Sequence, residues 1–182
     1  MSASSPEIYD QSANIGEIFR AFYMRWLGID PGLAIIGWAV LDETGGTIPD
    51  ILEFGTIETD KALSTPRRLL EIEQDYSELL NEFQPEAIAV EMPFFSRQIK
   101  AAGGVLQGVG VLNMVSLRER DIEPIFLHQS SWKCHIGNAK ADKREVALMV
   151  QSIFNIENMP IDDSVDAIAI AYAASCGLRN NI

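Results

Sequence analysis

Four acidic residues stand at positions where carboxylates could act together. Asp30 ends the apolar run RWLGID and precedes Pro-Gly, and Glu91 ends the run EAIAVE and precedes Met-Pro. Asp163 and Asp166 lie three residues apart in DDSVDAIAIAYAA, so on a helix their side chains are separated by about 60° around the axis and face one side. Asp162 points elsewhere and is expected to cap that helix.

Each acid also has a simpler interpretation when it is considered alone. Asp30 could bond its own backbone in a turn, Glu91 could be a surface acid at a strand end, and Asp163 could be a second helix cap. Taken together, the four acids favour a shared functional site over these separate structural roles. Several carboxylates in a low-dielectric pocket repel one another unless protons or divalent cations neutralise them.

The types of ligand indicate which cation would bind. Oxygen ligands without histidine or cysteine favour Mg²⁺ or Mn²⁺, and Mg²⁺ in turn favours phosphate substrates. Two such ions can activate a water and stabilise the leaving oxygen of a phosphodiester. The acids therefore predict a metal-dependent phosphoryl-transfer enzyme, and a nuclease is the form that we expect.

Apolar runs separated by turns predict the elements that must position these acids. The expected strands cover residues 25–30, 35–42, 51–59, 86–91 and 122–128, and the expected helices cover 64–83, 97–120, 142–154 and 162–176, with a polar loop at 129–141. Short turns join the first three strands, which predicts an antiparallel meander. The sequence thus predicts an α/β domain with a five-stranded mixed sheet and flanking helices.

One edge of this sheet is where the acids should meet. Ligands of such sheets bind outside the carboxyl ends of the strands, and both Asp30 and Glu91 lie at such ends. If their strands are parallel neighbours, the two carboxylates come within a few ångströms of each other. The glycines at 103, 104, 108 and 110 weaken the helix over 97–120 by about 1 kcal/mol each relative to alanine, which favours close contact with another helix, such as one in a second subunit.

Length and composition are typical of a globular protein. The 182 residues predict one domain, with 47% hydrophobic and 22% charged residues. No apolar stretch reaches the roughly 18 residues of a membrane span, so we expect no contact with a membrane. Residues 1–23 lack the pattern of a secretory signal, which predicts a cytoplasmic protein. They form either a disordered extension before the nuclease domain at 24–182 or a stretch upstream of a true start at Met24.

The net charge of −12 argues against attraction of the whole molecule to nucleic acid, since lysine and arginine usually drive phosphate binding. Binding to DNA would therefore need a local basic surface. Cys134 and Cys176 show no metal-ligand spacing, and we expect free thiols in a reducing compartment.

At the acidic residues the sequence resembles the RuvC family of Holliday-junction resolvases, which have a ribonuclease-H-like fold. The resemblance covers roughly residues 25–176 and is carried by LGIDPGLAIIGWAV, PEAIAVEMPFF, HIGNAKADKREV and DDSVDAIAIAYA. The first and last of these motifs are weak alone, but their combination is specific. On this resemblance the family's four catalytic and metal-binding acids fall on Asp30, Glu91, Asp163 and Asp166.

The resemblance implies a particular reaction. A homodimer would bind a four-way DNA junction in recombination and repair and make paired nicks at symmetry-related sites, leaving 5′-phosphate and 3′-hydroxyl ends. A two-fold dimer suits a substrate with two equivalent strands. The resemblance also implies two Mg²⁺ ions per subunit, which Mn²⁺ can replace, and junction-binding and branch-migrating motor proteins as partners.

The same resemblance implies which residues contact DNA. They are an aromatic residue that stacks in the distorted junction and basic residues that bind phosphate: Phe94, Arg97, Lys100, Lys133, Lys140, Lys143 and Arg144. Lys133 and Lys143 match the family's phosphate-binding lysines best. Phe94 could instead be a core residue beside Phe95. The basic cluster in and after the polar loop, which is Lys133, Lys140, Lys143 and Arg144 alongside His135, could be a solvated helix face.

Two other functions stay open at this point. Actin-like and sugar-kinase phosphotransferases also begin with a GIDxG hairpin, but they need two such domains, which 182 residues do not supply. A catalytically silent DNA-binding or scaffold module is supported by the acidic charge. Against it, a binding module gains nothing from carboxylates beside phosphates. The extension at 1–23, the acidic charge and the glycine-rich stretch FFSRQIKAAGGVLQG all depart from the family pattern.

Overall fold

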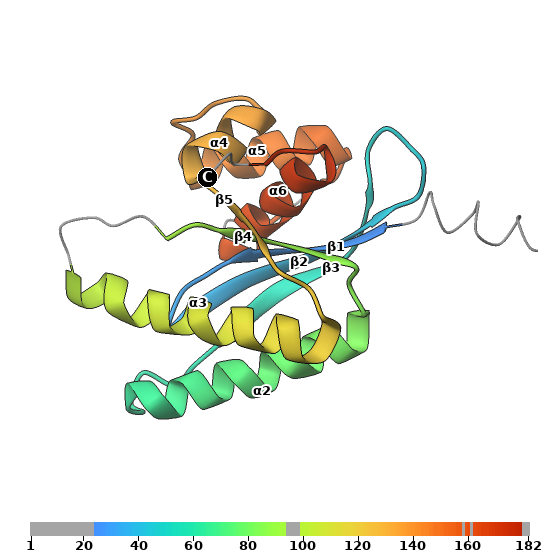
Figure 1. Cartoon of the computed structure of the whole chain (residues 1–182). Helices are drawn as coiled ribbons and strands as arrows, with labels where there is room; N and C mark the ends of the chain where they lie inside the picture. Colours follow the sequence, from blue (N-terminus) through green and yellow to red (C-terminus); the bar gives the residue numbers. More distant parts are fainter. Residues whose placement is uncertain (1–23, 94–98, 158, 161, 180–182) are drawn as a thin grey trace, which may run out of the picture.

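The chain alternates strands and helices, and a computed structural model describes residues 24–93, 99–157, 159–160 and 162–179, without the side chains of 99–102. The elements in chain order are β1 (Met24–Asp30), β2 (Ile35–Glu43), β3 (Asp50–Glu58), α2 (Thr65–Phe83), β4 (Ala87–Glu91), α3 (Ile99–Arg120), β5 (Ile125–Leu127), α4 (Gln129–Ile136), α5 (Lys143–Phe154) and α6 (Asp163–Ser175). One sheet separates two layers of helices. Figure 1 shows α2 and α3 on one face and α4, α5 and α6 on the other.

The strands form a sheet in the order β3-β2-β1-β4-β5. The first three strands are an antiparallel meander, and β4 and β5 run parallel to β1. This confirms the predicted five-stranded mixed sheet. Ile29 pairs with Val90, so the residues that follow them, Asp30 and Glu91, leave the sheet at the same edge.

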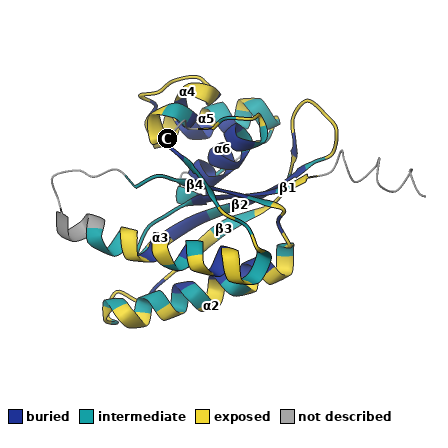
Figure 2. Ribbon diagram, viewed as in Figure 1, coloured by how far each residue is buried: buried dark blue, intermediate teal, exposed yellow. Residues whose placement is uncertain are grey.

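Hydrophobic cores lie on both faces of the sheet, and β1 contributes to each. Leu27 and Ile29 belong to the core under α2 and α3, whereas Trp26 belongs to the core under α4, α5 and α6. Figure 2 shows that the buried residues run through the central strands and α6. Ten of the 13 residues of α6 are buried, and five of these ten are alanine, so this helix lies close against the sheet. Within the described residues, no helix is long and apolar enough to cross a membrane.

The prediction of a polar loop over residues 129–141 is wrong for the first part of that segment, because Gln129–Ile136 form the helix α4. Trp132 and Ile136 lie one turn apart and are both buried, which gives α4 an apolar face. Gly137 ends the helix with φ of 145°, a conformation that favours glycine. Two apolar residues among polar neighbours do not establish a helical periodicity, so the sequence did not indicate this helix.

The last strand is shorter than predicted: β5 covers Ile125–Leu127, whereas the sequence predicts 122–128. Asp121 has φ of 55° and turns the chain at the end of α3, and Pro124 has no N–H for the ladder. Pairing with β4 therefore starts at Ile125. The other predicted elements agree to within two residues wherever their ends are described.

Candidate active site

Two glycines let α6 lie against the sheet where β1 ends. A Cβ on Gly37 would be 2.0 Å from the carbonyl oxygen of Asp163, and one on Gly28 would be 2.1 Å from that of Ala167. Gly37 also pairs with Asp30 across the β1–β2 ladder. Because helix backbone occupies the place of a side chain at both glycines, the first turn of α6 reaches the end of β1.

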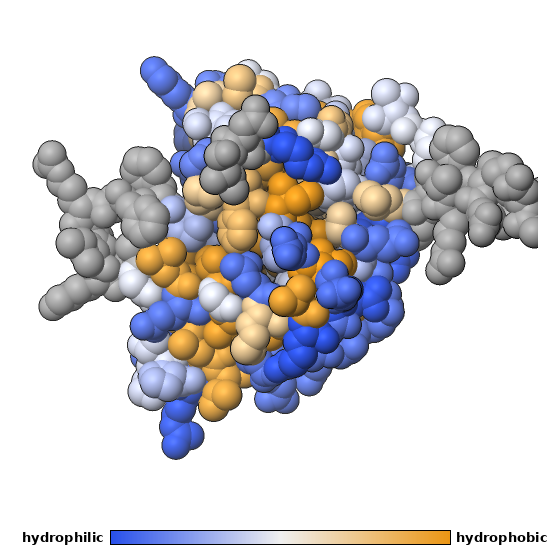
Figure 3. Space-filling model, viewed as in Figure 1, coloured by the Kyte–Doolittle hydropathy of each residue, from blue (hydrophilic) through white to orange (hydrophobic). Residues whose placement is uncertain are grey.

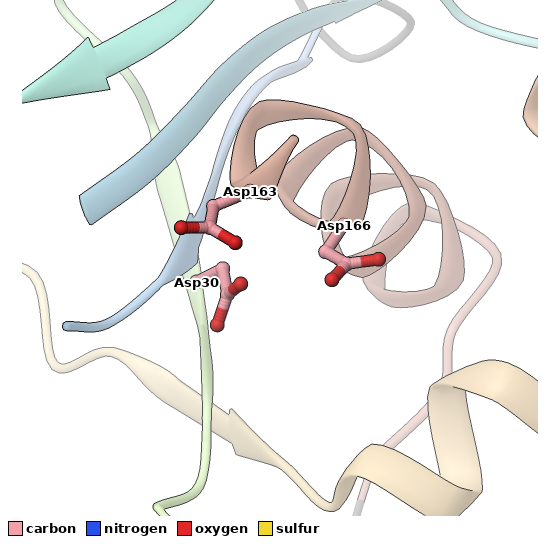
Figure 4. Close-up of side chains that lie close together, drawn as sticks. All are labelled: Asp30, Asp163 and Asp166. Atoms are coloured by element: carbon pink, nitrogen blue, oxygen red, sulfur yellow. The ribbon is translucent and has the colours of Figure 1, made fainter. Parts of the chain in front are cut away.

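A helix cap fixes the start of α6. Asp162 is the N-cap, and its carboxylate accepts a hydrogen bond from the Ser164 N–H at 2.9 Å, which confirms the predicted cap. Asp163 and Asp166 follow in the first turn. Carboxylate oxygens of Asp30, Asp163 and Asp166 lie within 4.8 Å of one another, around a common space (Figure 4). We call these three residues the acid cluster.

Glu91, the fourth predicted acid, lies beside the acid cluster but is not one of the residues within 4.8 Å of one another. Its Oε2 accepts a hydrogen bond from Trp132 Nε1 at 2.8 Å, and its Oε1 accepts one from Gln129 Nε2 at 3.2 Å. Its charge still raises the pKa of Asp30. The structure therefore brings all four acids to one edge of the sheet, with the fourth held by α4.

Burial and mutual repulsion disfavour the charged forms of these acids. Burial raises the pKa of Asp30 well above its ordinary value, and the charges of the other three acids raise it further. Burial is also the main reason why the pKa values of Glu91 and Asp166 are raised. Such a site is stabilised when a cation supplies positive charge.

The acid cluster fits a hard divalent cation. Within the described part of the chain, the group consists of carboxylates and contains no histidine or cysteine. Oxygen donors of this kind suit Mg²⁺ or Mn²⁺ better than softer metals. The ligand types and the raised pKa of Asp30 thus agree with the divalent metal that the sequence predicts.

Two lysines from the predicted basic cluster lie next to the acids. The Lys143 ammonium, at the start of α5, forms an ion pair with Asp163. Lys133 is only 9% exposed, and its Nζ donates to the carbonyl oxygen of Ala141 at 2.7 Å and lies 5.4 Å from the ring centre of Trp132. Both ammonium groups offset negative charge at the site. Lys133 does so from the interior rather than from the surface.

The other residues predicted to contact DNA are described in part. Phe94 and Arg97 lie outside the described residues, and Lys100 belongs to the part of α3 whose side chains are not described. Lys140 and Arg144 are exposed near the start of α5. Of the predicted basic surface, the structure therefore shows three exposed groups, Lys140, Lys143 and Arg144, of which Lys143 contacts the acid cluster.

Sequence reasoning missed the donors that hold Glu91. Trp132 and Gln129 fall in the segment predicted as a loop, and the signal available there was a single large aromatic residue among polar ones. A buried indole N–H usually finds an acceptor, which could have prompted a search for a nearby carboxylate. His135, which the sequence groups with the basic residues, packs against Tyr172, with 5.9 Å between ring centres.

The fold and the acid cluster together define a ribonuclease-H-like nuclease domain. Its antiparallel meander continues into parallel strands, and carboxylates from the first strand and the last helix meet at one edge.

Comparisons with known proteins identify the family within this class. A family model described as "Crossover junction endodeoxyribonuclease RuvC" matches residues 26–174. The protein of that name from Synechocystis sp. is 66% identical over 158 residues, which are 87% of this chain and 95% of the relative. Two structures of Thermus thermophilus RuvC, the second in complex with a Holliday junction substrate, are 30% and 28% identical; both have a TM-score of 0.73, and the match covers 85% of this chain and 97% of theirs. The chain belongs to the RuvC family, as its motifs predict.

Proposed function

We propose that this chain is a divalent-metal-dependent endonuclease that resolves four-way DNA junctions in recombination and repair. It makes paired symmetric nicks and leaves 5′-phosphate and 3′-hydroxyl ends. The observation that carries this proposal is the acid cluster, in which three carboxylates lie within 4.8 Å of one another at the carboxyl end of β1. Family membership supports the choice of substrate, since a Thermus relative has been solved with a Holliday junction.

The four acids would hold two Mg²⁺ or Mn²⁺ ions per subunit, as in two-metal phosphodiester cleavage. Asp30, Asp163 and Asp166, whose oxygens lie within 4.8 Å of one another, would hold metal, and Glu91 would supply a further carboxylate ligand. Bound ions would activate a water and stabilise the leaving 3′-oxygen. The protein's own part is to bury the acids, to fix their directions from α6 and α4, and to keep the substrate phosphate beside them.

The residues that we propose for DNA contact follow the family resemblance. They are Phe94, Arg97, Lys100, Lys140, Lys143 and Arg144. Lys133 stays among the predicted residues, but a direct contact with phosphate would require its ammonium to leave the carbonyl oxygen of Ala141. We therefore propose that Lys133 acts mainly through its charge on Glu91 and Asp166.

The acidic net charge is compatible with this proposal because part of it lies away from the site. The outer helix α2 carries five acids, Glu71, Glu73, Asp75, Glu78 and Glu82, against two arginines. Figure 1 places α2 on the opposite face of the sheet from α5 and α6. DNA that approaches the side of α5 therefore meets Lys143 and its neighbours rather than the acids of α2.

The protein partner that we propose is a second copy of the chain, paired through α3. Positions 103, 106, 110, 113 and 117 are spaced alternately by three and four residues, which is the spacing of a coiled-coil seam. A Cβ on Gly103 or Gly110 would meet no atom within 4 Å, and Leu106 and Leu117 are 39% and 51% exposed. Figure 3 shows hydrophobic residues reaching the surface on the face that carries α3.

A polar group in the same seam supports this pairing. The Oδ1 atom of Asn113 is buried without a hydrogen-bond partner. Next to it, α3 and β5 border a hollow of about 270 Å³ that includes Leu117 and Ile122 in its lining. In a two-fold pair the same face of α3 meets itself, so a turn of the Asn113 side chain would bring its amide to the second copy. A partnership with junction-binding and branch-migrating motor proteins is also proposed, from family membership alone.

A nicking assay on a synthetic four-way junction tests the function. Wild type and Glu91→Gln would be compared with and without Mg²⁺. We expect wild type to cut two opposed strands only with the metal, and the variant to bind the junction without cutting it. Full activity of Glu91→Gln or of Asp30→Asn would contradict the mechanism, and a wild type that binds but never cuts would identify a silent DNA-binding module.

A further inference from the structure

The helix α4 holds the carboxylate of Glu91 through both of its oxygens. The Trp132 indole donates to Oε2 at 2.8 Å, and the Gln129 amide donates to Oε1 at 3.2 Å. The backbone of Glu91 is fixed separately, since it pairs with Leu127 and the next residue, Met92, donates its N–H to the Leu127 carbonyl. The strand β4 therefore fixes the backbone position of Glu91, and α4 fixes the direction of its carboxylate.

The two donors differ in how firmly they are held. Trp132 is fully buried in the core between α4, α5 and α6, so its indole has no room to move away from Glu91. Gln129 is exposed at the first turn of α4, and its bond is the longer of the two. Water or another ligand can replace Gln129, whereas a buried indole N–H that lost Glu91 would be left without an acceptor.

This asymmetry assigns different tasks to the two oxygens. We propose that Trp132 is a positioning residue that keeps Oε2 of Glu91 throughout, so that Glu91 binds a metal ion through Oε1 alone and displaces Gln129. The inference rests on the metal site of the proposed function. It adds that Oε1 of Glu91 binds the metal, that Trp132 holds Oε2 and that Gln129 is displaced. Without Trp132, the carboxylate would be free to turn between several directions, and metal binding would have to order it.

Trp26 provides a matched control within the same chain. Its Nε1 donates to Glu43 Oε2 at 3.1 Å, it is 3% exposed, and it lies four residues before Asp30 on β1, about 13 Å along the strand. A change of tryptophan to phenylalanine at either position removes an indole–carboxylate hydrogen bond and keeps an aromatic ring in the core. One bond involves a predicted metal ligand and the other does not.

The first experiment measures the Mg²⁺ requirement of junction nicking in Trp132→Phe and Trp26→Phe. We expect Trp132→Phe to raise the half-saturating Mg²⁺ concentration by about tenfold or more, which is the usual effect of removing a partner that orients a metal ligand. Trp26→Phe should stay near wild type, and Gln129→Ala should not raise the Mg²⁺ requirement, because the metal displaces Gln129 from Oε1. An equal effect of the two phenylalanine variants, or a larger effect of Gln129→Ala than of Trp132→Phe, would overturn the proposal.

The second experiment needs neither activity nor a variant that folds well. Indole and side-chain amide N–H signals of the full-length wild type are followed by NMR while Mg²⁺ is added without DNA, after each indole signal has been assigned. The Trp132 indole should shift yet stay protected from exchange, the Gln129 amide should move toward the signal of a solvated glutamine, and the Trp26 indole should stay in place. Loss of protection at Trp132 would mean that both oxygens bind the metal, and the assignment would be wrong.

The two experiments also separate this inference from the proposed function. If wild type does not cut the junction but the NMR signals respond to Mg²⁺ as described, the proposed reaction fails and the role of Trp132 stands. If cutting occurs and the Trp132 signal does not respond, the reaction stands and the role of Trp132 is refuted.

Discussion

The carbonyl oxygen of Asp163 lies where a Cβ of Gly37 would be, only 2.0 Å from that position. Gly37 is the ladder partner of Asp30, so this one contact joins the β1–β2 hairpin to the start of α6 and brings two acids of the cluster together. The absence of a side chain at Gly37 is therefore a condition for the site rather than a feature of a turn.

Replacing Gly37 with alanine should disrupt both stability and activity. The new methyl group meets helix backbone, which cannot move aside as a side chain can, so α6 must shift away from Asp30. Overpacking of this kind usually costs about 1–3 kcal/mol of unfolding free energy, and loss of the metal site should reduce nicking much further. Urea denaturation and the nicking assay would measure the two effects. Gly46→Ala is the control, because its methyl would meet only ordinary contact at 3.4 Å, and equal losses in both variants would refute the argument.

Much of the fold and the acids of the site could be predicted because they leave a local pattern. β1 and β4 are buried on both faces and read as continuous apolar runs, and each ends abruptly in an acid followed within two residues by proline. The spacing of Asp163 and Asp166 likewise follows from helix geometry alone. These are properties of short segments, and a single sequence displays them.

The remaining features depend on contacts between segments far apart in the chain. Trp132 reaches Glu91 across 41 residues, and the ammonium of Lys133 turns inward to Ala141 because α4 is a helix, which its polar composition did not indicate. The role of Gly37 likewise appears only once α6 is packed on the sheet. No periodicity in one segment encodes the side chain that another segment will place beside it.

Stability should depend on pH through Asp30. Its pKa is raised in the folded protein, so the folded state holds a proton that the unfolded chain releases between the ordinary pKa and the raised one. The contribution of Asp30 to stability is therefore present at low pH and is lost as pH rises through the raised pKa. In metal-free buffer, Tm should fall as pH rises from the ordinary pKa of an aspartate through the raised pKa of Asp30, and Mg²⁺ should restore part of it.

Asp30→Asn tests this directly, because it keeps the shape of the side chain and removes the charge. At about pH 8 with EDTA we expect a higher Tm than wild type, a smaller dependence on pH and no nicking. Glu53→Gln, at an exposed position of β3, serves as the control and should change none of these. An Asp30→Asn variant that melts below wild type without metal would contradict the repulsion that we infer.

Lys143→Ala should have opposite effects on two ligands. The lysine neutralises Asp163 in the absence of metal, so its removal should let Mg²⁺ bind more tightly without DNA. Junction binding should weaken, and the slope of log affinity against log salt should fall by about 1, since one phosphate contact is lost. Calorimetry and binding titrations at several salt concentrations would measure both. Arg118→Ala, which breaks a surface ion pair with Glu73, controls for loss of a positive charge, and an unchanged salt slope in Lys143→Ala would remove that residue from the DNA contacts.

Leu117→Glu should separate the subunits if α3 forms the interface. Leu117 is 51% exposed and lies one turn after Asn113 in the proposed seam, so a carboxylate there would be buried twice across a two-fold axis. We expect a loss of about 2 kcal/mol or more in dimerisation free energy, roughly 30-fold in Kd, with the circular dichroism spectrum unchanged. Sedimentation measurements would give the oligomeric state. Leu70→Glu, at a 66% exposed position of α2, should leave it unaltered. Paired nicks need two active sites at a fixed separation, so the Leu117→Glu monomer should also lose coordinated cutting of the two strands. A dimer that persists in this variant would place the interface elsewhere.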